Sequence, residues 1–125
     1  MKDKHDLQAV DRLILDKIRT VPHLEGLLLL WTARPKLWTA QELAQRLYVS
    51  SDTASRILLD LCSEDLAVDA GSVPKRYSYN GAWEQLLSGL EIAYRTDLIR
   101  ISNLIHSKSA VHEFAKAFRF KKESE

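Results

Sequence analysis

The chain has 125 residues, of which 46% are hydrophobic and 28% charged, with only 4 Gly and 3 Pro. This length and composition favour one globular domain with an appended element, and argue against a multidomain enzyme or a disordered chain. The 18 Lys and Arg residues nearly balance the 17 Asp and Glu residues, which leaves a net charge of +1. No overall field therefore points to nucleic acid or a membrane, and such a partner has to be held by a local patch.

The cysteine usage and the apolar runs indicate the compartment. Cys62 is the single cysteine, so an internal disulfide is excluded, and residues 1–6 are too polar to begin a secretion signal. The longest apolar run, residues 27–31, has five residues, whereas a membrane-spanning helix needs about 20. We expect a soluble protein of the reducing cytoplasm with no membrane partner.

Two amphipathic helices are predicted at the start of the chain. Apolar side chains recur at three- and four-residue steps over residues 6–19 and again over residues 22–33. Pro22 suits the first turn of the second helix, where its missing N–H costs nothing, and Pro35 ends that helix.

Two further helices follow, each with its own N-cap. Thr39 and Glu42 have the spacing of a capping box, which predicts a third helix from Thr39. A second cap within residues 50–52 predicts a fourth helix that continues to about residue 65. The apolar positions expected to pack between these two helices are Leu43, Ala44, Leu47, Ile57, Leu58 and Leu61.

A short β-hairpin is predicted next. Residues 67–69 and 75–79 are rich in β-branched and aromatic side chains, and residues 70–74 between them contain Gly, Ser and Pro. An isolated two-stranded ribbon is marginally stable, so a third short strand is expected at residues 37–38.

Asn80 can cap a last, long helix of about 25 residues. Its apolar side chains are separated by 4, 3, 4, 4, 3 and 4 residues, an a/d-like seam with one four-residue insertion. We expect this seam to join two chains as a homodimer, with packing inside one chain as the alternative. Its residues are Trp83, Leu87, Leu90, Tyr94, Leu98, Ile101 and Ile105. A shorter helix is expected over residues 109–120, followed by a frayed tail.

The pattern Thr-x-x-Glu-Leu-Ala-x-x-Leu-x-Val-Ser, which starts at Thr39 and is followed by a helix, resembles the winged helix-turn-helix of bacterial transcription regulators such as the MarR and ArsR families. The resemblance covers residues 22–80. It implies a mainly α fold with a small β-hairpin wing. The expected regions are an N-terminal helix (1–21), the winged helix-turn-helix domain (22–80) and a C-terminal helical dimerisation region (81–125).

The resemblance also implies sequence-specific binding of double-stranded DNA and transcriptional regulation. A helix that protrudes after residue 50 can enter the major groove, and Arg56 can pair with a guanine. The expected DNA-binding residues are Arg46, Ser51, Thr53, Ser55, Arg56, Lys75 and Arg76. Asp52 and Asp60 lie on or near this helix and would repel phosphate, so a protein-docking adaptor without DNA binding remains the alternative.

The sequence gives little indication of a catalytic, cofactor or metal site. No nucleophile with a nearby base, Gly-rich phosphate loop or paired acid is present, so no enzymatic activity and no cofactor are expected. The four His residues and Cys62 lack metal-ligand spacing. Cys62 is expected to be a core residue, with an oxidation-sensing thiol as the alternative. A pocket for a small-molecule effector beside the long helix also stays open, without a polar constellation that identifies its ligand.

Overall fold

The computed structural model describes the backbone of residues 4–107 and the side chains of residues 9–107. Its elements in chain order are α1 (Lys4–Lys17), α2 (Val21–Thr32), α3 (Ala40–Leu47), α4 (Ser51–Ser63), β1 (Ala67–Asp69), β2 (Tyr77–Tyr79), α5 (Glu84–Thr96) and a further helical stretch over residues 98–107. The described chain is mainly helical with one small antiparallel sheet, which confirms this coarse part of the predicted fold class. None of its helices is both long enough and apolar enough to cross a membrane.

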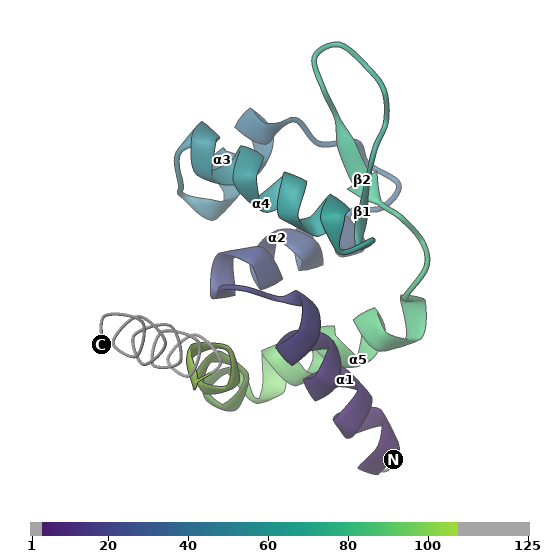
Figure 1. Ribbon diagram of the computed structural model, residues 1–125, viewed down its shortest axis with the longest axis vertical. Coiled ribbons are helices and arrows are strands. Elements are labelled where there is room, and N and C mark those ends of the chain that lie inside the picture. The colour runs from purple at the N-terminus through teal and green to yellow at the C-terminus, as the bar shows by residue number, and fades with distance from the viewer. Residues whose placement is uncertain (1–3, 108–125) are drawn as a thin grey trace, which may run out of the picture.

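α2 is the central element of the arrangement. It contacts α3, α4 and β2 on one side and α5 on the other, while α1 packs chiefly on α5 (Figure 1). Leu24, Leu27 and Leu30 of α2 are fully buried in the single core that these elements share. We refer below to α2, α3, α4 and the hairpin as the upper half, and to α1, α5 and residues 98–107 as the lower half.

Side-chain caps set where the helices of the upper half begin. The Thr39 hydroxyl accepts from the Glu42 backbone N–H at 3.1 Å, and the Glu42 carboxylate accepts from the Thr39 N–H at 2.9 Å. Ser50 Oγ accepts from the Thr53 N–H at 3.0 Å at the start of α4. Both predicted caps are therefore confirmed, and these helices begin where their caps place them.

Gly26 lets α2 cross α3 and α4 at close range. A Cβ added at this position would lie 3.2 Å from Ile57 Cγ2, 3.6 Å from Leu47 Cδ1 and 3.7 Å from Leu43 Cδ2. Any larger side chain here would push against both helices at once. Because Gly26 has no side chain, α3 and α4 can pack directly on the backbone of α2.

The hairpin is antiparallel, with Ala67 opposite Tyr79 and Asp69 opposite Tyr77. Trp38 adds one bridge to it: the Trp38 N–H donates to the Tyr77 carbonyl at 2.7 Å, and the Tyr77 N–H donates to the Trp38 carbonyl at 2.8 Å. The predicted third strand is therefore confirmed as a single bridge. Through it, the segment before α3 is fastened to the base of the hairpin.

The prediction of one long helix from Asn80 is wrong at both its start and its middle. Asn80 instead accepts from the Ala82 N–H, and Gly81 turns the chain with φ +85°, so α5 begins only at Glu84. The helix then stops at Asp97, whose φ of −143° and ψ of 50° lie outside the helical region. The helix and tail predicted over residues 109–125 lie outside the described residues.

Candidate nucleic-acid interface

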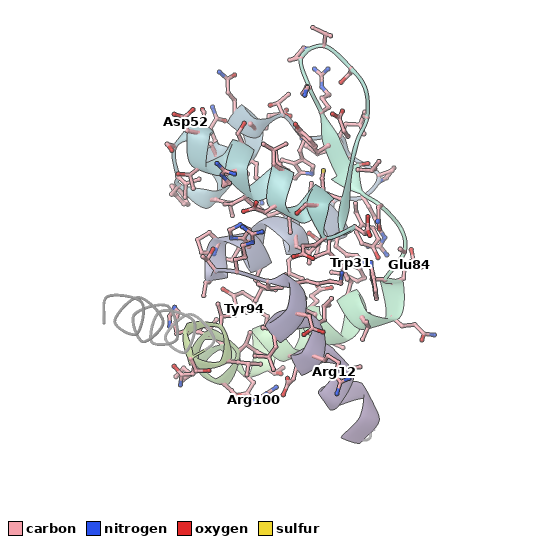
Figure 2. All side chains as sticks on the ribbon, viewed as in Figure 1. Arg12, Trp31, Asp52, Glu84, Tyr94 and Arg100 are labelled. Carbon is pink, nitrogen blue, oxygen red and sulfur yellow. The ribbon has the colours of Figure 1, made fainter. Side chains whose placement is uncertain are left out.

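α4 turns one polar side toward solvent and one apolar side toward the core. Four of the predicted DNA-binding residues, Ser51, Thr53, Ser55 and Arg56, are exposed on the outer side together with Asp52, which Figure 2 shows near the start of the helix. The inner side buries Ala54, Ile57, Leu58 and Leu61. The first two turns of α4 are therefore free to meet another molecule.

Arg56 lies beside a groove of about 650 Å³ between the N-terminal ends of α2 and α4. Thr20, Pro22 and Ile57 contribute to its lining, and Asp52 lies at the same groove. The Arg56 guanidinium has no hydrogen-bond or ion-pair partner within the described residues. Its five N–H donors are thus available to an acceptor outside the chain.

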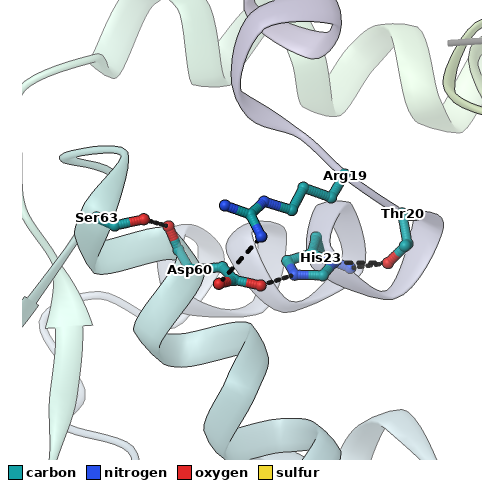
Figure 3. A network of polar contacts seen from close by, with 5 residues as sticks. All are labelled: Arg19, Thr20, His23, Asp60 and Ser63. Atoms are coloured by element: carbon teal, nitrogen blue, oxygen red, sulfur yellow. Dashed lines mark hydrogen bonds and ion pairs between the residues drawn. The ribbon is translucent and has the colours of Figure 1, made fainter. Parts of the chain in front are cut away.

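Asp60 does not face this outer side, contrary to the expectation that it would repel phosphate there. Its carboxylate is buried against α2, where it accepts from His23 Nε2 at 2.8 Å and lies 3.5 Å from Arg19 Nη1 (Figure 3). The Thr20 hydroxyl lies 2.6 Å from His23 Nδ1, on the other side of the ring. This Asp60 network ties α4 to the start of α2 and so fixes the direction of α4.

Two cations lie over the Trp38 ring at the base of the hairpin. Lys36 Nζ lies 4.7 Å and the Arg46 guanidinium 5.9 Å from the centre of the Trp38 ring. Lys36 also lies 3.9 Å from the Glu42 carboxylate. Arg46, which was predicted as a DNA-binding residue, is thus joined here by Lys36, which sequence reasoning missed.

The cations near Glu42 affect the pKa of its carboxyl group. The Thr39 backbone N–H lowers the pKa of the Glu42 carboxyl, and the nearby charges of Lys36 and Arg76 lower it further. Two cations, Lys36 and Arg76, therefore act on this one carboxylate, while Arg46 lies by the Trp38 ring. Lys36 could have been found from the sequence, because it directly precedes the short strand that was expected to join the hairpin.

The loop of the hairpin extends away from the core. Lys75 is exposed and has no partner within the described residues. The Asp69 carboxylate accepts from the Gly71 N–H at 2.8 Å, and the Ser72 hydroxyl donates to the Pro74 carbonyl at 2.9 Å, which shape the loop. Lys75 belongs to this loop, which Figure 1 shows extending beyond β1 and β2.

Large apolar side chains are also exposed in the upper half. Tyr48 is 94% exposed at the α3–α4 turn, Leu59 is 51% exposed on α4, and Val73 is 96% exposed in the hairpin loop. Such residues occur singly on most surfaces. In this protein the three exposed apolar residues lie on α4, on the α3–α4 turn that precedes it and in the hairpin that follows it.

The predicted dimerisation seam is mostly buried within its own chain. Leu87, Leu90, Ile101 and Ile105 have no exposed surface, and Trp83 and Tyr94 are half-buried. Packing inside one chain, the alternative that the sequence left open, accounts for these side chains. Of the seven, only Leu98 is well exposed, at 50%, and its neighbour Ile99 is 75% exposed.

Two alternatives raised by the sequence concern the Cys62 thiol and a pocket for a small-molecule effector. Burial raises the pKa of the half-buried Cys62 thiol, and the nearby Asp69 carboxylate raises it further, which disfavours a reactive thiolate. A hollow of about 240 Å³ between α2, α3 and α5 corresponds to the proposed effector pocket, and Glu25, Arg46 and Tyr94 are its charged and phenolic lining residues. This volume is below the usual range for ligand sites.

No protein-family model, curated protein or solved structure matches this chain. Within residues 4–107, no group of three or more His, Cys, Asp or Glu side chains is arranged to hold a metal ion.

Proposed function

We propose that the protein is a winged helix-turn-helix regulator that binds double-stranded DNA in a sequence-specific manner and acts as a homodimer. The observation that carries this proposal is the exposure of the first half of α4, whose inner face packs on α2 and is hydrogen-bonded to it through Asp60 and His23. α3 and α4 then form the helix-turn-helix, and the β1–β2 hairpin is the wing.

The dimensions of α4 suit a major groove. Its 13 residues span about 20 Å, and the groove of B-form DNA is about 12 Å wide. Arg56 presents a fork of donors to guanine O6 and N7, while Ser51 and Ser55 reach bases or phosphates. Asp52 need not oppose binding, because a carboxylate can accept from the amino group of cytosine.

Affinity comes from the local cations rather than from the net charge. Arg46 and Arg76 at the base of the wing and Lys75 on its loop can contact phosphates beside the groove, with Arg56 as the fourth cation. The three cations of each subunit that contact phosphate give about six contacts in the dimer, which corresponds to a slope of log K against log salt concentration near −5. Lys36 is a further cation at the same edge.

A homodimer is supported by the exposed pair Leu98 and Ile99 in the lower half. A second copy that covered both side chains would remove apolar surface that the described chain leaves in water. In this proposal the contact between the two copies lies after the break at Asp97 and not along the predicted seam. Two-fold symmetry would match the two half-sites of a palindromic operator.

The alternative function is a winged-helix adaptor that docks another protein through the same face. The exposure of Leu59 and Val73 favours it, because apolar side chains contribute to protein interfaces more than to phosphate contacts. The adaptor would bind its partner with weak dependence on salt.

Binding by two variants tests the proposal. Arg56→Ala should relax the base preference at one position in each half-site, whereas Lys75→Ala should weaken binding to all sequences and flatten the salt slope of the dimer by about two units, roughly one for each subunit. Fluorescence anisotropy with DNA selected from a random pool, at several salt concentrations, measures both effects. Arg12→Ala is the matched control, since Arg12 is an exposed cation of α1 in the lower half.

The outcomes separate the two functions. Loss of preference in the first variant and a flatter slope in the second, with no change in the control, support DNA binding. If the parent protein shows no salt-dependent affinity for duplex DNA, the regulator proposal fails. Capture of a protein whose binding is lost in Leu59→Asp would then establish the adaptor.

A further inference from the structure

The α3–α4 turn holds a residue that the backbone there disfavours. Tyr48 caps the C-terminus of α3 with φ 58° and ψ 44°, which is the left-handed helical region. In that region the Cβ of an L-residue crowds the following carbonyl oxygen, so Gly or Asn normally occupies a helix C-cap of this kind. A bulky aromatic side chain at this position is an outlier.

The other left-handed positions show the contrast. Within the described residues, positive φ angles occur at Gly71, Gly81, Asp65 and Tyr48. Glycine carries no penalty there, and aspartate is several-fold enriched in this region. Tyr48 is therefore the one position of the four whose residue type does not suit its backbone.

No contact among the described residues offsets this strain. The Tyr48 side chain is 94% exposed, so its ring gains almost no burial. The turn itself is held by main-chain bonds, since the Val49 N–H donates to the Ala44 carbonyl at 3.1 Å, and glycine would make these bonds equally well. A strained residue without an internal contact points to a role outside the folded chain.

The position of the turn suggests what that role is. The turn leads directly into Ser50, the cap of α4, while the wing follows the opposite end of α4 (Figure 1). A helix lying in a groove has a sugar–phosphate backbone on each side of it. The cations of the wing approach one backbone, and Tyr48 projects at the other end of the same helix.

We infer that Tyr48 binds the sugar–phosphate backbone of DNA at the α3–α4 turn. Its hydroxyl donates a hydrogen bond to a phosphate oxygen, and its ring covers the adjoining deoxyribose. This inference rests on the proposed function and adds a neutral contact on the side of α4 away from the wing. Because the phenol is neutral, the contact contributes affinity without releasing a counterion.

Three substitutions separate the side chain from the backbone strain. Tyr48→Ala removes the ring and keeps the strain, whereas Tyr48→Gly removes both. Both should weaken DNA binding about threefold to tenfold, and only Tyr48→Gly should raise the melting temperature, by about 2–5 °C. Tyr48→Phe keeps the ring, so its loss of affinity should be smaller.

The measurements are anisotropy titrations on selected DNA at several salt concentrations, and thermal unfolding followed by circular dichroism. The salt slope of all three variants should match that of the parent, unlike the flatter slope expected for Lys75→Ala. Parent-like affinity in Tyr48→Ala would overturn the inference and leave the proposed function standing. A loss of DNA affinity in Tyr48→Gly but not in Tyr48→Ala would also overturn the inference, because the change in the backbone and not the loss of the ring would then be responsible.

Two further outcomes are decisive. If the parent protein does not bind duplex DNA, the proposed function fails and this inference fails with it. If the parent binds DNA and Tyr48→Ala loses affinity only for a protein partner, the ring docks that protein and the DNA contact is refuted.

Discussion

The contacts inside the upper half of the molecule differ in kind from those inside the lower half. In the upper half, side chains cap α2, α3 and α4, the Asp60 network joins α2 to α4, and Gly26 sets their separation. In the lower half, α5 begins without a side-chain cap, and the tight contacts are aliphatic. The main polar link there, from Arg100 to Asp11 and Asp97, lies at the surface (Figure 2).

This difference has a consequence for function. Apolar burial is not directional, so it determines that two helices pack but only loosely at which angle. Caps and buried hydrogen bonds have defined geometry, and they fix where a helix begins and where it points. The upper half is therefore the part that can present a surface of fixed shape, which a reading helix requires.

The largest expected effect comes from breaking the Asp60 network. Asp60→Ala leaves His23 buried without its acceptor and removes the partner of Arg19. The free energy of unfolding should fall by about 3 kcal/mol, since removal of one member of a buried polar pair leaves the other unsatisfied. Urea unfolding at pH 7 measures this loss.

Asp52→Ala is the matched control on the same helix. Asp52 is exposed and has no partner within the described residues, so its removal should change the unfolding free energy by less than about 0.5 kcal/mol. Equal losses in the two variants would show that the network does not distinguish the upper half.

Sequence reasoning succeeded where the signal is local. The spacing of Thr39 and Glu42 and the apolar periods placed the four helices of residues 4–63 within about two residues of their observed bounds. It failed at Asp97, where no Gly or Pro marks the break. The run Leu90, Tyr94 and Leu98 had indicated an insertion within one helix, and the chain breaks at that insertion instead.

The candidate site was predictable only in part for the same reason. Exposure of Ser51, Ser55 and Arg56 follows from the helical period alone. The pairing of His23 with Asp60 joins residues 37 positions apart, and Arg100 reaches Asp11 across 89 positions. Such pairs have no signature in one sequence, because each of these polar side chains could equally have remained in contact with water.

A smaller effect is expected from the polar link of the lower half. Arg100 Nη1 lies 3.2 and 3.0 Å from the two carboxylate oxygens of Asp11, and Arg100 Nε donates to Asp97 at 2.8 Å. These groups are 33–53% exposed, so solvent weakens the interaction. Arg100→Ala should lower the unfolding free energy by about 0.5–1 kcal/mol.

A double-mutant cycle with Asp11→Ala isolates the pair. We expect a coupling energy below about 1 kcal/mol, measured by urea unfolding at low ionic strength and decreasing as salt is added. Arg95→Ala, an exposed cation of α5, is the control and should show no coupling with Asp11. A coupling as large as the loss in Asp60→Ala would contradict the contrast between the halves.

The smallest effect concerns the cap of α3 and depends on pH. The bond from the Thr39 N–H lowers the pKa of Glu42 below its ordinary value of 4.5 in the folded protein. A lowered folded-state pKa stabilises the protein above the unfolded value, and this stabilisation is lost as the pH falls through the folded value. At pH 7 the parent should exceed Glu42→Gln in unfolding free energy by about 0.5 kcal/mol, because the side chain of Glu42 is nearly half exposed. Urea unfolding of both proteins at pH 7 and at pH 3 should show that the difference disappears in acid, and a difference that grew in acid would mean that the carboxylate opposes the cap.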